Sequence, residues 1–257
     1  MDGRLFILCP LIFFAGLVDS IAGGGGLISL TAYAACGVPM GFALGTNKFS
    51  SSCGTVFSSA RYIFGRRAEL KTALVSMAFA LAGSALGAAA VQAMDKTFLK
   101  YMMIAATPIV AVFVMKKKDY GTGKRRKHFV KPVLFLLCGL SGLVIGFYDG
   151  FYGPGTGTFF IMVFTGVIGF DLITASGNAR LANLASNIAA LAVFIRAGQV
   201  VYALAVPCAV CAIGGNLVGS GLAIKRGARF IKPVFAAVLA LIAAYVAADL
   251  ANLLPKG

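Results

Sequence analysis

Residues 16–25 read GLVDSIAGGG, and residues 146–155 read GFYDGFYGPG. Both stretches carry an aspartate at the fourth position and glycines at the first, eighth and tenth, at an offset of 130 positions. Three further pairs of segments match at an offset of 132: 43–48 with 175–180, 83–87 with 215–219, and 98–100 with 230–232. A nearly constant offset over this length indicates that the chain is an internal duplication.

The composition indicates a membrane protein. Hydrophobic residues make up 60% of the 257 residues, charged residues 12%, and the mean hydropathy is +0.91. Soluble domains carry about 25% charged residues. The long apolar runs show no strand-like alternation, so they predict helices rather than a barrel. These runs are Leu5–Val18, Thr72–Val91, Phe98–Met115, Ala203–Ile224 and Pro233–Leu250.

We therefore predict an all-α polytopic membrane protein with two membrane repeats, 1–115 and 133–257, joined by a basic cytoplasmic loop at 116–132. Each repeat is expected to begin with a broken or re-entrant helix pair and to continue with three transmembrane helices. The two repeats are predicted to be inverted relative to one another. The first apolar segment has an internal copy at Val133–Tyr148, so it is not expected to be a cleaved signal.

The net charge of +15 predicts membrane orientation rather than nucleic-acid binding. The largest basic cluster lies between apolar blocks and no nucleic-acid-binding motif surrounds it, whereas cytoplasmic loops commonly collect Lys and Arg. If the broken segments re-enter, 17 of the 23 basic residues fall on one side. We predict that this side is the cytoplasm of a bacterial inner membrane and that both termini are periplasmic. The cluster contains Lys116, Lys117, Lys118, Lys124, Arg125, Arg126, Lys127 and Lys131.

Glycines break an apolar run at the same place in each repeat. Glycine costs about 1 kcal/mol in a helix interior and proline about 3 kcal/mol, so these runs predict real helix breaks. A helix that starts within the membrane presents unpaired N–H groups and a partial positive charge, which together favour an anion. The alternative is that small residues merely allow close helix packing. The predicted anion-binding positions are Gly24, Gly25, Gly26, Gly155, Thr156 and Gly157.

Asp19 and Asp149 each precede a break by four residues, inside apolar sequence. A carboxylate within a membrane is costly and usually functional, so proton coupling is one interpretation. The alternative is that the two aspartates cap the broken helices or pair with Lys48 or Arg180. Both interpretations stay open at the level of sequence.

A polar stripe runs along residues 48–62. Lys48, Ser51 or Ser52, Thr55, Ser59 and Tyr62 recur at helical spacing, which predicts one polar helix face. Its copy contains Arg180, Asn183 and Asn187, and together these cations and neutral donors could hold an oxyanion. The alternative for each cation is a side chain that snorkels to the membrane surface. The predicted substrate-binding residues of this group are Asn47, Lys48, Ser52, Asn178, Arg180, Asn183 and Asn187.

Other motifs predict packing rather than chemistry. Gly83-x-x-x-Gly87 and Gly215-x-x-x-Gly219 are typical of close helix contacts. Asn216 lies within the second motif, and the sequence does not decide whether it faces a cavity. We expect no catalytic residue, metal or cofactor, because the single histidine lies in the basic loop and all six cysteines fall in apolar segments.

The string Asp19–Gly26, followed by Leu44–Lys48, resembles the sulfite exporter TauE/SafE family, also called 4-toluene sulfonate uptake permeases. Residues 146–157, 183–187 and 198–199 of the second half agree, and the resemblance extends from about Gly16 to Phe235. One departure is Arg180, preceded by Asn178-Ala179 where relatives often show Asn-Thr-Lys. The resemblance implies a bacterial carrier of sulfur-containing anions such as sulfite, sulfonates or sulfoacetate.

Three functions are compatible with these features. The first is a secondary carrier that holds a small anion between the repeats and moves it across the bilayer, with or without proton coupling. The second is an anion channel built on the same site. The third is an integral membrane enzyme, which the lack of a carboxylate cluster or metal-ligand spacing disfavours.

Overall fold

A computed structural model describes residues 3–94, 129–238 and 240. Within these ranges the chain is helical and contains no strand. The predicted segment Phe98–Met115, most of the basic loop and most of Pro233–Leu250 lie outside the described residues. The elements are α1 (Leu5–Ala22), α2 (Gly25–Ala35), α3 (Met40–Phe64), α4 (Leu70–Ala93), α6 (Lys131–Phe151), α7 (Thr156–Val163), the π-helical turn η1 (Phe164–Ile168), α8 (Leu172–Arg196) and α9 (Tyr202–Arg226).

Five of the described helices, α1, α4, α6, α8 and α9, are long and apolar enough to cross a membrane. The 25-residue α3 is also long enough, but its polar stripe lowers its hydropathy. Large apolar side chains such as Phe6, Phe64 and Leu136 are exposed, whereas many polar side chains are buried. An apolar exterior around a polar interior is the arrangement expected for a chain surrounded by lipid.

Both predicted helix breaks are present. In the first, Gly23 ends α1 with φ 86° and α2 begins at Gly25. In the second, Gly153 (φ 93°) and Gly155 (φ 81°) separate α6 from α7. Residues with a side chain rarely adopt these left-handed angles, so glycine is what permits the sharp turns.

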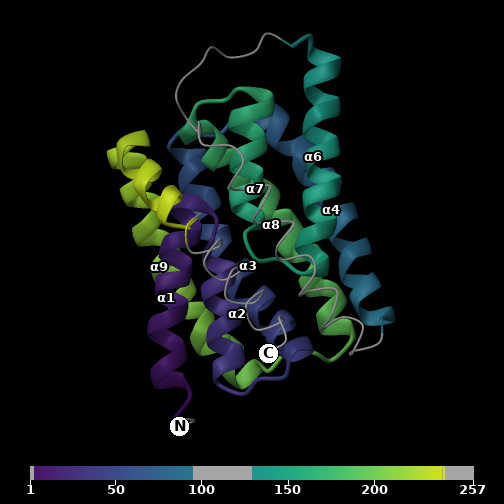
Figure 1. Cartoon of the computed structure of the whole chain (residues 1–257), viewed down its shortest axis with the longest axis vertical. Coiled ribbons are helices and arrows are strands. Elements are labelled where there is room, and N and C mark those ends of the chain that lie inside the picture. Colours follow the sequence, from purple (N-terminus) through teal and green to yellow (C-terminus); the bar gives the residue numbers. More distant parts are fainter. Residues whose placement is uncertain (1–2, 95–128, 239, 241–257) are drawn as a thin grey trace, which may run out of the picture.

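The first break reverses the direction of the chain. A Cβ on Gly25 would lie only 2.2 Å from the carbonyl oxygen of Ala15, so α2 starts against the body of α1. Figure 1 shows α2 returning alongside α1. The first broken pair is therefore a hairpin.

The first helix of each half packs against a helix of the other half. α1 packs against α9, and its repeat equivalent α6 packs against α4. A Cβ on Gly215 would lie 2.0 Å from the Phe13 carbonyl oxygen, and one on Gly83 would lie 2.1 Å from the Leu143 carbonyl oxygen. The prediction that the two glycine motifs serve close packing is confirmed. Figure 1 also shows that α1 and α6 run in opposite directions.

Two hydrogen bonds between the halves are related to each other by the same internal repeat. The Thr46 hydroxyl of α3 accepts from the N–H of Val201 just before α9, at 3.1 Å. The Asn178 side chain of α8 accepts from the N–H of Glu69 just before α4, at 2.8 Å. Asn178 lies 132 positions after Thr46, and Val201 lies 132 positions after Glu69. The internal duplication is therefore also present in tertiary contacts.

Basic residues gather at one end of the bundle, where α3 ends, α8 begins and α9 ends. A Cβ on Gly177 would lie 2.2 Å from the Arg67 carbonyl oxygen, and one on Gly65 would lie 3.6 Å from Ile224 Cδ1. The basic residues near these contacts are Arg61, Arg66, Arg67, Lys71, Lys225 and Arg226. Among the described residues, Arg4 and Arg196 lie toward the other end, at the start of α1 and the end of α8.

Candidate functional site

The two helix breaks touch each other. A Cβ on Gly23 would lie 2.2 Å from the carbonyl carbon of Gly157, so the two backbones are in direct contact. The Thr158 hydroxyl crosses between them and donates to the Ala22 carbonyl oxygen at 2.9 Å. Two turns that lie 130 residues apart in the sequence therefore form one buried junction.

Neither helix that starts at this junction has a side-chain cap. Gly24 precedes α2 and Gly155 precedes α7, and neither can accept through a side chain. The Thr156 hydroxyl donates to the Gly153 carbonyl oxygen at 2.7 Å. Within the described parts of the chain, the N–H groups of Gly25, Gly26 and Gly157 have no acceptor. Both helix starts thus present N–H groups and a partial positive charge to the junction.

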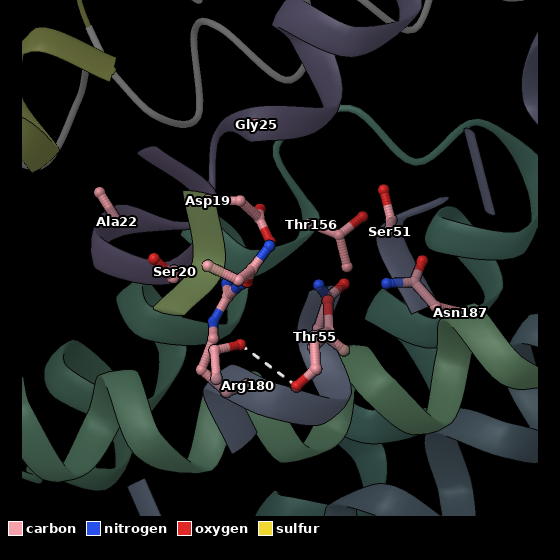
Figure 2. A network of polar contacts seen from close by, with 12 residues as sticks. Asp19, Ser20, Ala22, Gly25, Ser51, Thr55, Thr156, Arg180 and Asn187 are labelled. Carbon is pink, nitrogen blue, oxygen red and sulfur yellow. Dashed lines mark hydrogen bonds and ion pairs between the residues drawn. The ribbon is translucent and has the colours of Figure 1, made fainter. Parts of the chain in front are cut away.

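Two buried ion pairs cross between the repeats. Lys48 Nζ of α3 lies 2.6 Å from Asp149 Oδ2 of α6, and both side chains are 3% exposed. Arg180 Nη1 of α8 lies 2.5 Å from Asp19 Oδ2 of α1, with exposures of 0% and 15%. Figure 2 shows the Asp19 carboxylate and the Arg180 guanidinium pointing toward each other. A buried charge without a partner is costly, so each aspartate stabilises its buried cation at the junction.

Further polar contacts fix the Lys48 ammonium. It also donates to the Asn187 side-chain oxygen at 2.9 Å. A Cβ on Gly153 would lie 3.4 Å from Nζ, which places the ammonium beside the second break. Of the alternatives that the sequence left open for the two aspartates, pairing with Lys48 and Arg180 is the one found in the structure. Lys48 is buried, so it does not snorkel to the membrane surface.

The Arg180 guanidinium has spare donors. Its Nε and Nη2 are buried and have no hydrogen-bond partner among the described residues. A Cβ on Gly157 would lie 2.1 Å from Nη2, so the glycine lets the guanidinium lie against the break. Buried donors without acceptors are unfavourable, so a water or an anion would stabilise them.

Hydroxyl groups on α3 continue this donor surface. Ser52, Thr55 and Ser59 are buried, and their side-chain oxygens have no partner among the described residues. Their spacing places them on one face of the helix, as the predicted polar stripe requires. Tyr62, at the end of the stripe, donates to the Ser20 carbonyl oxygen at 3.2 Å.

A small cavity of ≈ 20 Å³ lies beside the Asp19 carboxylate and the start of α2. This volume holds about one water molecule, so a larger anion enters only if the surrounding side chains move apart. Its polar lining comes from α1, α2, α3 and α9. The lining residues are Ile12, Ala15, Gly16, Asp19, Gly25, Ser29, Asn47, Ser50, Ser51, Ala212 and Asn216.

Comparison with known proteins agrees with this architecture. The profile of the family "Sulfite exporter TauE/SafE" matches residues 8–246. The chain belongs to the TauE/SafE family. It is 31% identical over 253 residues to "Probable membrane transporter protein YfcA" of Escherichia coli K12, covering 95% of this chain and 93% of the relative.

Two other relatives of this TauE/SafE protein carry similar names. "Probable membrane transporter protein" of Haemophilus influenzae is 34% identical over 234 residues, covering 90% of this chain and 89% of the relative. "Probable membrane transporter protein ORF9" of a Sinorhizobium species is 34% identical over 249 residues, covering 95% and 93%. No solved structure matches the chain significantly. This TauE/SafE protein is therefore a membrane transporter.

The remaining predicted residues of the TauE/SafE protein lie at different distances from the junction. Asn47 lines the cavity and accepts from the Ser51 hydroxyl at 3.2 Å. Asn183 is buried on α8. Asn178 uses its amide to hold the start of α4, because it accepts from Glu69 N–H and donates to the Thr72 hydroxyl at 3.0 Å. Its contacts are those of a structural residue.

Sequence reasoning did not include four polar cavity residues in the substrate-binding set: Ser29, Ser50, Ser51 and Asn216. Each lies on a helix whose rotation about its own axis decides what it faces, and apolar neighbours conceal that rotation. A comparison of the two repeats was the available signal, because Ser29, Ser50 and Asn216 differ from their equivalents. The equivalent positions 159, 182 and 84 carry Phe, Ala and Ser. Within the described residues, no three His, Cys, Asp or Glu side chains lie together in a way that could hold a metal ion.

Proposed function

We propose that this TauE/SafE protein is a secondary carrier that moves a small sulfur-containing anion across a bacterial inner membrane. The observation that carries the proposal is the junction, where two uncapped helix starts meet beside the spare Arg180 donors and where Asp19, the partner of Arg180, lines a small polar cavity. Helix starts and arginine are the groups that proteins commonly use to hold oxyanions. Sulfite, sulfonates and sulfoacetate are the substrate class that the family resemblance implies.

In the proposed binding step, the anion replaces Asp19 on the Arg180 guanidinium. Asp19 is the partner that gives way because it is the more exposed carboxylate and lines the cavity, whereas Asp149 is nearly fully buried against Lys48. An Asp19 carboxylate released into the cavity would repel the anion, so it takes up a proton. One proton then accompanies each anion, and Lys48 and Asp149 keep the second break in place.

The carrier is proposed to alternate by movement of the two repeats around this junction. The exchanged partners of α1 and α6, and their opposite directions, support repeats that are inverted relative to one another. The basic end of the bundle, at Arg67 and Lys225, is proposed to face the cytoplasm. Both termini would then lie in the periplasm.

Transport into proteoliposomes tests the function directly. Purified protein is reconstituted, and uptake of sulfite, thiosulfate, sulfonates and carboxylates is measured with and without a pH gradient. We expect saturable uptake of at least one sulfur anion, accelerated when the gradient drives protons in the same direction. Carboxylate transport without sulfur-anion transport would contradict the substrate class, and lack of saturation together with channel-sized currents would identify a channel instead.

A further inference from the structure

The Asn216 side chain of α9 presents an acceptor that no described residue uses. Asn216 is 2% exposed and lines the cavity beside Asp19. Its amide nitrogen donates to the Ala212 carbonyl oxygen at 3.0 Å, which fixes which end of the amide is the nitrogen. The other end, Oδ1, is buried and has no hydrogen-bond partner among the described residues.

The Asn216 amide has little freedom to turn. A Cβ on Gly16 would lie 2.9 Å from Nδ2, and one on Gly54 would lie 2.4 Å from it, so the nitrogen is enclosed between α1 and α3. A side chain at either glycine would displace the amide nitrogen. The amide is therefore held in place, and its unpaired oxygen belongs to a residue that lines the cavity.

The positions that the repeat relates to this cavity do not reproduce the acceptor. Position 84, the equivalent of Asn216, is a serine whose hydroxyl donates to the Ser186 carbonyl oxygen at 2.6 Å. Apolar residues occupy the equivalents of three other polar lining residues: Phe159 for Ser29, Ala179 for Asn47 and Ala182 for Ser50. The polar cavity, which α1, α2 and α3 of the first repeat form with α9 of the second, therefore lies on one side of the junction, which is expected if one anion binds there.

The cavity combines donors with acceptors. The Gly25 N–H at the start of α2 is available as a donor, while Asn216 Oδ1 is available as an acceptor. An anion that only accepts hydrogen bonds would leave Oδ1 unpaired. An anion that keeps one O–H or N–H group would satisfy both kinds of group, and buried polar groups left unpaired are the strongest basis for rejecting an analogue.

We propose that Asn216 makes this site selective for small singly charged oxyanions that carry a hydrogen-bond donor, such as hydrogen sulfite or an aminosulfonate, over anions of the same shape that lack one. The proposal rests on the anion site of the proposed function. It adds that the selecting residue is Asn216 and that the substrate is bound in a singly protonated or amino-bearing form.

Sulfamate and methanesulfonate are suitable probes, because both are singly charged at neutral pH and differ in an amino group replacing a methyl group. The dissociation constant of each anion is measured by calorimetry or by thermal stabilisation of the purified full-length protein, and as inhibition of sulfite uptake in proteoliposomes. We expect wild-type protein to bind sulfamate about tenfold more tightly, which corresponds to about 1.4 kcal/mol. The Asn216→Ala variant should bind the two anions about equally.

The control variant is Ser84→Ala, which changes the equivalent position of the other repeat and should keep the tenfold preference. The ratio of two anions within one variant does not depend on how much of the protein is folded. Equal binding of both anions by wild type, or a preference that survives Asn216→Ala, would overturn the selectivity while leaving the carrier function standing. Binding of neither anion by a wild-type protein that takes up no sulfite would overturn the anion site itself.

Discussion

The ion pair between Asp19 and Arg180 gives the sharpest prediction, because the account assigns it both a structural and a transport role. Arg180→Met removes a cation that is fully buried, and Asp19→Asn removes its partner, which is 15% exposed. Removing one member of a buried ion pair costs about 3–5 kcal/mol, because the other charge stays buried and unpaired. We expect Asp19→Asn to lie at the upper end, since it leaves the fully buried guanidinium without its carboxylate.

The double variant Asp19→Asn/Arg180→Met leaves no unpaired charge and should recover most of the lost stability. For a chain of this size, 1 kcal/mol corresponds to about 2–4 °C in melting temperature, so each single variant should melt on the order of 10 °C below wild type. The assay is thermal unfolding of purified protein in detergent, followed by sulfite uptake in proteoliposomes. The two variants that lack Arg180 should not transport sulfite, because Arg180 is the group proposed to receive the anion. Asp19→Asn should lose the acceleration of uptake by a pH gradient, because the group proposed to take up the proton is absent.

The matched control is Arg196→Met, which changes the same residue type on the same helix at an exposed position. It should keep both the melting temperature and the uptake rate of wild type. The reasoning is refuted if the double variant transports sulfite at the wild-type rate, or if both single variants are as stable as the control.

Three further predictions follow from the packing and the orientation. Gly157→Ala should abolish transport, because its Cβ would lie 2.1 Å from Arg180 Nη2; a variant that transports normally would show that the guanidinium need not lie against the break. On α9, Gly215→Ala should lower the melting temperature, because its Cβ would lie 2.0 Å from a backbone oxygen of α1, while the neighbouring Gly214→Ala, whose nearest atoms lie at 3.4 Å, should not; equal melting of the two variants would contradict the packing. In a background without other cysteines, Arg66→Cys should react with an impermeant thiol reagent from the cytoplasmic side and Ala197→Cys from the periplasmic side, and labelling of both from one side would refute the proposed orientation.

The features that the sequence predicts are those that repeat or that break a helix. The glycines at 23–26 and 153–157 predict breaks from local backbone preferences alone, and both breaks are present. The polar stripe on α3 follows from helical spacing. These predictions need no knowledge of how distant parts of the chain pack.

The features that sequence could not predict depend on tertiary packing. Asp19 lies 161 positions from Arg180, and nothing local states that it pairs with the cation of the other repeat while Asp149 pairs with Lys48. Asn178 is an asparagine on α8, like Asn183 and Asn187 of the predicted binding set, yet its side-chain amide holds the start of α4. Only the position of neighbouring helices distinguishes such cases.

The central claim is that an oxyanion binds where the two helix breaks meet and displaces Asp19 from Arg180. The most direct measurement is anomalous diffraction from crystals of the protein soaked with selenite, the heavier analogue of sulfite. We predict a selenium peak within hydrogen-bond distance of the Arg180 guanidinium and the first amides of α2, with Asp19 moved away from Nη1. A peak elsewhere in the protein, or an Arg180 that still pairs with Asp19 while selenite is bound, would contradict the account.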